Sequence, residues 1–190
     1  MKLVNRFAAH ALAGVIVIST AALAQPRTIT RGELSEWIVR ASDRASGGAR
    51  HLSQPVAEAM ADAALAHADT NEALAMASIE VAIAWFETGG QLVNDPAGSN
   101  DHGASACWAQ IYLPHNARTE EGWTGGELRA DPKKCATVAV RLVRASIASS
   151  PSCDGCELTV YARGRDTAEG RRLSRVRMAL ARRLLSEVTR

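Results

Sequence analysis

The sequence has no long stretch in which apolar and polar residues alternate, which excludes a fold built mainly from strands. It also has no internal repeat and no low-complexity tract, so neither a repeat solenoid nor a biased linker is expected. The histidines show no H-x-x-x-H or comparable ligand spacing, and we expect neither a metal site nor a cofactor. The histidines concerned are His51, His67, His102 and His115.

The first 24 residues have the pattern of a secretory signal peptide. Lys2 and Arg6 form a positive start, residues 8–23 are almost free of polar groups, and residues 22–24 form a small-x-small cleavage signal. The alternative is an uncleaved membrane anchor, but the apolar core at 11–18 is short for a span of about 20 residues. No cysteine stands near the cleavage signal to carry a lipid. We predict cleavage before Gln25 and an exported protein, periplasmic or secreted, without stable membrane insertion.

Length and charge limit what the mature chain, residues 25–190, can be. Removal of 24 of the 190 residues leaves 166, enough for one compact domain and not comfortably for two. The removed segment carries two basic residues and no acidic ones, so 20 basic residues then balance 20 acidic residues. A mature chain without net charge predicts no nucleic-acid partner. The pattern makes no prediction of the oligomeric state.

Apolar residues at helical spacing predict five helices in the mature chain, at 33–45, 55–67, 70–88, 132–148 and 167–188. Pro55 and Pro132 suit first helical turns, and Thr70 or Asn71 can cap the third helix. The third helix is apolar on nearly every side, which indicates a buried central helix. The predicted fold class is all-α, with at most a short strand element. Residues 91–106 have the composition of a loop, and the apolar run at 107–113 is either a strand or a buried turn.

The four cysteines all lie in the mature chain, and an even number in an exported protein indicates disulfides. They are Cys107, Cys135, Cys153 and Cys156. Three pairings are possible, of which we favour 107–135 with 153–156, and the spacing leaves the other two open. Residues 153–156 also have the C-x-x-C spacing of thiol-disulfide proteins. A redox motif of this kind follows a strand and stands at the start of a helix, whereas residues 149–152 have the composition of a loop.

Glu87 is the strongest catalytic candidate, because it ends the most apolar helix of the chain. Trp85 and Phe86 precede it, and the glycines at 89 and 90 follow. Burial and the negative end of the helix dipole both favour the neutral form, so we expect a raised pKa, as a general acid needs. The alternative is a surface glutamate where the helix leaves the core. Glu80 lies two turns earlier on nearly the same face, either as a second carboxylate or, as we expect, paired with a buried polar group.

The segment 82–90 resembles the catalytic helix end of lytic transglycosylases and goose-type lysozymes, an apolar helix that ends in Glu-Ser and is often followed by Gly. Glu87 matches the glutamate, and Thr88 stands where serine is usual. The segment 103–111 resembles the Gly-Leu-Met-Gln-Ile segment that lines the sugar cleft of this family. Gln110 and Ile111 match that segment, while Cys107 replaces its glycine and Ala109 replaces its methionine.

Two further segments resemble the same family in the same order. Residues 128–142 are similar to its Asp-Pro helix, with Cys135 where asparagine is common. Residues 158–164 are similar to its Ala-Tyr-Asn-x-Gly segment, in which Tyr161 and Gly164 are kept and Ala162 replaces asparagine. The resemblance implies a lysozyme-like helical domain over the mature chain. A 107–135 disulfide would then fasten the cleft segment to the Asp-Pro helix.

The resemblance implies cleavage of peptidoglycan glycan strands, with Glu87 protonating the glycosidic oxygen. In a transglycosylase the same glutamate then removes a proton from a sugar hydroxyl and closes an anhydro ring. In a lysozyme a second carboxylate directs water, for which Asp95 and Asp101 are the candidates unless they are turn residues. The expected substrate-binding residues are Thr88, Gln110, Ile111 and Tyr161.

Two other functions fit parts of the sequence. A lysozyme-like module that binds peptidoglycan or an envelope partner without cutting it would explain Ala109 and Ala162. A thiol-disulfide protein would use Cys153 and Cys156. Trp108 and Trp123 are candidates for stacking on sugars or for core packing. Six arginines between 171 and 183 form either a solvated helix face or a face that holds anionic polymer or lipid.

Overall fold

The computed structural model describes residues 28–66, 68–92, 104–114 and 117–188. The predicted signal peptide and both Asp95 and Asp101 lie outside these ranges. Within them the chain forms helices and one antiparallel hairpin, which confirms the helical fold class with a short strand element. The elements are α1 (Arg31–Ala45), α2 (Gln54–Leu65), α3 (Thr70–Glu87), β1 (Ser105–Ala106), β2 (Ile111–Tyr112), α4 (Gly125–Ala130), α5 (Pro132–Ser149), α6 (Thr159–Arg163) and α7 (Ala168–Val188).

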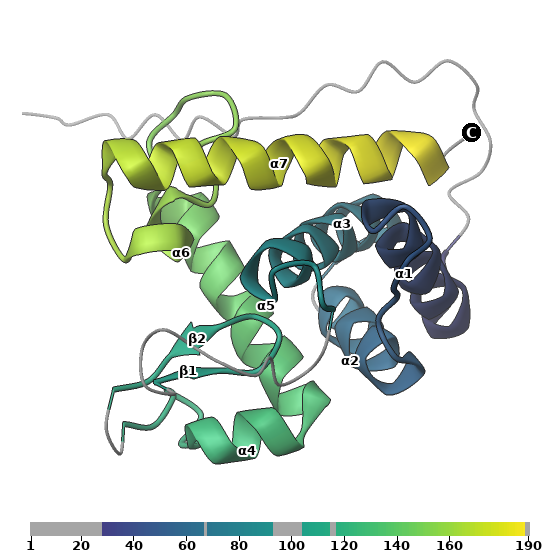
Figure 1. The fold of residues 1–190 in the computed structure, drawn as a ribbon, viewed down its shortest axis with the longest axis horizontal. Coiled ribbons are helices and arrows are strands. Elements are labelled where there is room, and N and C mark those ends of the chain that lie inside the picture. The colour runs from purple at the N-terminus through teal and green to yellow at the C-terminus, as the bar shows by residue number, and fades with distance from the viewer. Residues whose placement is uncertain (1–27, 67, 93–103, 115–116, 189–190) are drawn as a thin grey trace, which may run out of the picture.

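The helices surround α3, with α7 along one side of the molecule and the hairpin and α4 on the opposite side (Figure 1). The most extensive helix contacts join α1 to α2, α3 to α7 and α2 to α5. Buried apolar residues from α1, α2, α3, the hairpin, α5 and α7 form one continuous core. This arrangement places the C-terminal end of α3 next to α7, which runs past it.

The helix α3 is buried along most of its length, as its apolar composition predicts, with buried residues from Ala73 to Ala84. Its N-cap is Asp69, whose carboxylate accepts hydrogen bonds from the backbone N–H of Asn71 and Glu72. The expectation that Thr70 or Asn71 caps the helix was wrong by one or two residues. Both lie inside the first turn, where the aspartate oxygen accepts from the N–H of Asn71 and not from that of Thr70.

Local capping also explains two differences from the predicted boundaries. The helix α1 begins at Arg31 because Thr30 and Glu33 form a reciprocal capping box ahead of it. The short helix α4 was not predicted, although Thr124 and Glu127 form a second capping box at its start. The helix α5 begins as expected, with Asp131 as N-cap and Pro132 in the first turn.

Both favoured disulfides are present, Cys107–Cys135 and Cys153–Cys156, with Cα–Cα distances of 6.2 and 5.4 Å. Cys153 and Cys156 lie in turns, and α6 begins only at Thr159, so the segment lacks the strand and helix of a redox motif. Disulfides form and persist in oxidising compartments, which agrees with export. Among the described residues, no helix is both long and apolar enough to span a membrane.

The two tryptophans near the predicted cleft differ in environment. Trp108 is completely buried and belongs to the core, which decides between the two roles considered for it. Trp123 is half-buried, and the Lys134 ammonium lies 5.5 Å from its ring centroid. This distance is within the range of a cation–π interaction.

Candidate active site

Glu87 is the last residue of α3, and its side chain is 22 % exposed. Its Oε1 accepts a charged hydrogen bond from Nη2 of Arg177, a residue of α7 whose side chain is only 8 % exposed. Glu87 does lie where the helix leaves the core, but it is only partly exposed and has a charged partner. The carboxylate lies at the α3–α7 junction, partly open to solvent and bound to a buried guanidinium.

Opposing influences act on the pKa of Glu87. Burial is the largest and raises it, whereas the charge and hydrogen bond of Arg177 and the charge of Arg163 lower it. Burial outweighs the others, so the pKa of Glu87 lies above its ordinary value of 4.5. This direction confirms the expectation from the apolar helix. The cationic partner was not expected.

Arg177 escaped prediction although its position on α7 carries a signal. On one side of this helix the sequence places Leu173, Val176, Leu180, Leu184 and Val188, of which Leu180 and Leu184 are buried but Val176 is 45 % exposed. A neighbouring row is also buried, with Arg177 in its middle. That row consists of Gly170, Ser174, Arg177, Ala181 and Leu184. A basic residue at the centre of a small and apolar helical stripe is the pattern that could have identified it.

The other arginines of α7 agree with a solvated helix face. Arg171 pairs with Asp166, and Arg182 pairs with Asp154 and Glu157. Arg183 lies 3.9 Å from Glu187 one turn along the helix. Exposed pairs of this kind contribute little to stability.

Tyr161 connects α6 to the predicted cleft segment. Its hydroxyl donates a hydrogen bond of 2.6 Å to the carbonyl of Ala109. Its backbone N–H donates to the Ser146 hydroxyl at 2.9 Å, which ties α6 to α5. Burial raises the pKa of the Tyr161 hydroxyl well above its usual range; the negative charge of Glu87 adds to the rise, and the positive charge of Arg177 opposes it. The structure thus places Glu87, Tyr161 and the 107–110 turn in one region.

The turn between the strands holds two side-chain-bearing residues in the left-handed region, Cys107 at φ +58° and Gln110 at φ +48°. Each such residue costs about 1–2 kcal/mol relative to ordinary backbone. Glycine adopts this conformation without that cost, and glycine is the residue that the resembled cleft segment has at position 107. The disulfide to Cys135 holds the turn against α5. The Gln110 amide donates to the Cys107 carbonyl at 3.1 Å.

Two of the predicted sugar-binding side chains are buried. Thr88 is 4 % exposed, and its hydroxyl donates to the Ala84 carbonyl at 2.7 Å and accepts from the Leu92 N–H at 2.8 Å. These bonds fasten the segment that follows α3. Ile111 is 5 % exposed and belongs to the core. Gln110 is half-buried. Substrate contacts by Thr88, Gln110, Ile111 and Tyr161 stay predictions.

Glu80 differs from its expected environment. It is completely buried in α3, and neither carboxyl oxygen has a hydrogen-bond partner among the described residues. The expectation that it pairs with a buried polar group was wrong. Burial raises its pKa well above the ordinary value of 4.5, which keeps the carboxyl neutral in the folded protein.

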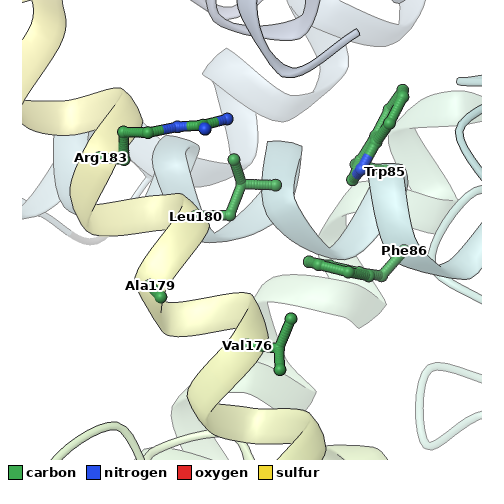
Figure 2. Close-up of a pocket in the computed structure, with 6 residues that line it drawn as sticks. All are labelled: Trp85, Phe86, Val176, Ala179, Leu180 and Arg183. Carbon is green, nitrogen blue, oxygen red and sulfur yellow. The ribbon is translucent and has the colours of Figure 1, made fainter.

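A groove lies between the end of α3 and α7, where its lining includes Phe86 and Val176, the chain neighbours of Glu87 and Arg177 (Figure 2). Its volume is about 340 Å³. Figure 2 shows Phe86 and Leu180 reaching into the space between the two helices. Phe86 and Val176 remain 39 % and 45 % exposed, which is unusual for large apolar side chains that lie close together. The lining residues are Trp85, Phe86, Val176, Ala179, Leu180 and Arg183.

The described residues contain no group of three or more His, Cys, Asp or Glu side chains able to hold a metal ion. Comparisons with protein-family models, with curated proteins and with solved structures gave no match to this chain.

Proposed function

We propose that this protein cleaves the glycan strands of peptidoglycan, with Glu87 as the general acid. The observation that carries the proposal is a partly exposed carboxyl at the end of a buried helix, whose pKa burial raises above 4.5. A general acid needs both features, since it must hold a proton and meet its substrate. The resemblance of four segments to lytic transglycosylases and goose-type lysozymes supplies the substrate class.

The reaction starts from the neutral form of Glu87. Its proton passes to the glycosidic oxygen, the bond from that oxygen to the sugar C1 breaks, and an oxocarbenium-like centre forms. The carboxylate then takes the proton of a hydroxyl on the same sugar while that oxygen bonds to C1. The ring so formed is an anhydro sugar, and Glu87 regains its proton. This sequence needs one carboxyl group and makes the protein a lytic transglycosylase.

A lysozyme would need a second carboxylate to direct water. Glu80 is fully buried and does not meet this requirement. Asp95 and Asp101 stay candidates by sequence. We further propose that the N-terminal 24 residues direct export to the periplasm or the exterior, where peptidoglycan is found and where the two disulfides can form.

The test is digestion of purified peptidoglycan by the exported, disulfide-bonded protein, with the products identified by mass spectrometry. Glu87→Gln serves as the inactive variant, and Glu36→Gln, on the exposed side of α1, serves as its matched control. Anhydro-muropeptides from the wild type and the control only would support the transglycosylase. Reducing-end products would make the protein a lysozyme. No products from the folded wild type would overturn enzymatic cleavage.

A second candidate is a module that binds glycan without cutting it. The ion pair with Arg177 favours this function, since it stabilises the charged form of Glu87, which cannot donate a proton. The exposed aromatic Phe86 in the neighbouring groove also suits a binding surface. Sedimentation with insoluble peptidoglycan distinguishes the two functions. A binding module would sediment equally as wild type and as Glu87→Gln and release no products.

A further inference from the structure

Arg177 is a charged residue on a helix face that otherwise buries small and apolar side chains. It lies in the middle of the buried face of α7, and its Nε and Nη1 groups have no hydrogen-bond partner among the described residues. Taking a charged guanidinium out of water costs several kcal/mol, and a single hydrogen bond does not compensate for unpaired buried donors. The arrangement is poor for stability, which indicates that its value lies in the one bond that it makes to Glu87.

That bond reaches only one oxygen of Glu87. Nη2 of Arg177 donates to Oε1, and among the described residues Oε2 accepts no hydrogen bond. The other charged or titratable groups in this region are the exposed Arg163 and the hydroxyl of Tyr161, both on α6, and Glu80 within α3. Of these, only Arg177 is both cationic and in contact with the carboxylate.

A carboxyl that first donates a proton and then removes one must reach both its neutral and its charged form. Burial alone raises the pKa and favours the neutral form, which makes the carboxyl a weaker acid and hinders the first proton transfer. A fixed cation at one oxygen stabilises the charged form without blocking the other oxygen. Glu87 therefore needs a counterion that stays in one place, and Arg177 is held there by α7.

We propose that Arg177 is a positioning residue for the acid–base cycle of Glu87: it binds Oε1, leaves Oε2 for proton transfer, and stabilises the carboxylate between the two proton transfers. The inference rests on the proposed function, because the cycle in question is the glycan cleavage described above. When Glu87 gives up its proton, the electron pair of the broken O–H bond stays on the carboxylate beside Arg177. The carboxylate later takes up the proton of the sugar hydroxyl.

The direct test is titration of the Glu87 carboxyl by NMR in full-length protein labelled with ¹³C at the glutamate carboxyl. The Glu87 signal is assigned by its loss in Glu87→Gln. We expect Arg177→Gln and Arg177→Met to move the titration midpoint upward by about 1–3 pH units, as for loss of a contacting opposite charge. Arg177→Lys keeps the charge and should move it by less than half of that. Arg182→Gln is the control, because Arg182 pairs with Asp154 and Glu157 elsewhere on α7.

An unchanged midpoint in the neutral variants, or an equal shift in Arg177→Lys, would overturn the proposal. Two neutral variants are used so that the result does not depend on one of them folding. If neither folds while Arg177→Lys does, the charge at this position serves the fold, and the proposal is overturned. If all three fail to fold, Arg177 is a structural residue and the proposal fails.

A kinetic readout separates the positioning role from a merely structural one. Loss of activity toward high pH marks deprotonation of the acid, and in Arg177→Gln this limb of the kcat/KM profile should move upward with the NMR midpoint. Turnover should fall at least tenfold, because a carboxyl with a higher pKa gives its proton to the glycosidic oxygen less readily. If the midpoint shifts but the wild type cleaves no glycan, the proposed function fails and the electrostatic coupling stands. If the wild type cleaves and the midpoint does not shift, only the role of Arg177 fails.

Discussion

Arg177 on α7 holds the carboxylate of Glu87 at the end of α3, although 90 residues separate them in the chain. The guanidinium is buried and the carboxylate is partly exposed, so the pair connects the core to the surface. It also sets two opposing influences on one acid: burial raises the pKa of Glu87, and the arginine lowers it. The candidate active site thus depends on the packing of α3 against α7.

The two partners should differ in their effect on stability when each is replaced by leucine. Glu87→Leu leaves the Arg177 charge buried without a partner, and we expect a loss of about 3–5 kcal/mol in the free energy of unfolding. Arg177→Leu should cost less, because Glu87 can take up a proton whereas arginine cannot release one. Urea unfolding at pH 7 and pH 5 measures both. If Glu87→Leu and Arg177→Leu lost the same free energy of unfolding as each other at pH 7 and again at pH 5, an electrostatic pairing would be contradicted.

The pH dependence in Arg177→Leu has a definite sign. Without its cation the folded-state pKa of Glu87 lies further above the ordinary value of 4.5. A group whose pKa is raised by folding contributes stability that is present below 4.5 and lost as the pH rises through the folded-state pKa. The cost of Arg177→Leu should therefore grow between pH 5 and pH 7. A cost that shrinks over this range would contradict the prediction.

Glu80 should make the protein less stable as the pH rises. Its folded-state pKa lies well above the ordinary value of 4.5. Once the pH exceeds 4.5, the free energy of unfolding of the wild type should therefore fall relative to that of Glu80→Gln. The slope is at most about 1.4 kcal/mol per pH unit. Unfolding of both proteins between pH 4 and pH 8 tests this. The variant Glu36→Gln, at an exposed position, controls for the exchange of a carboxylate for an amide. If the free energies of unfolding of the wild type and of Glu80→Gln changed in parallel with pH, Glu80 would not be buried as described.

Removal of the Tyr161 hydroxyl should loosen the cleft segment. Tyr161→Phe deletes the 2.6 Å bond to Ala109 and leaves a buried carbonyl without this donor, at a cost of about 1–3 kcal/mol. The control is Tyr112→Phe, because Tyr112 is 64 % exposed. Thermal unfolding compares the two, and the rate of glycan release should fall only in Tyr161→Phe. Equal behaviour of the two variants would remove Tyr161 from the site.

The glycines after α3 offer a matched pair. Both have positive φ, +58° at Gly89 and +78° at Gly90, so alanine is strained at either position. A Cβ at Gly89 would meet nothing within 4 Å, whereas one at Gly90 would lie 2.8 Å from the Trp85 ring. Gly89→Ala should cost about 1 kcal/mol. Gly90→Ala should cost more and should displace Trp85, which intrinsic fluorescence can report; the reverse order of costs would contradict this packing.

The two disulfides should differ in their contribution to stability. The Cys107–Cys135 bond spans 28 residues and the Cys153–Cys156 bond spans 3. Loop-closure entropy predicts about 3–4 kcal/mol for the first and about 2 kcal/mol for the second. Replacement of each pair by alanine, followed by urea unfolding, measures these losses. Loss of the first pair should also slow glycan release, because that bond holds the left-handed turn at Cys107.

Sequence patterns predicted those features that depend on neighbouring residues. Helical periodicity located α1, α2, α3, α5 and α7 to within a few residues, because the burial of one helix face repeats along the chain. The capping box at Thr124 and Glu127 was an available signal for α4 that periodicity over six residues could not supply. On α7 the expected stripe correctly included the buried Leu180 and Leu184, but it also included the exposed Val176 and missed the buried Arg177.

The sequence by itself determined that the chain is helical, that an apolar helix ends at Glu87, and that burial raises the pKa of this glutamate. Only the tertiary structure decided what Glu87 contacts. Its bond to Arg177 spans 90 residues, and the bond from Tyr161 to Ala109 spans 52. The physical reason is that capping and periodicity act within a few residues, whereas these partners meet only after α6 and α7 have packed against the rest of the core. The same packing left Glu80 buried without a hydrogen-bond partner among the residues that the structure describes.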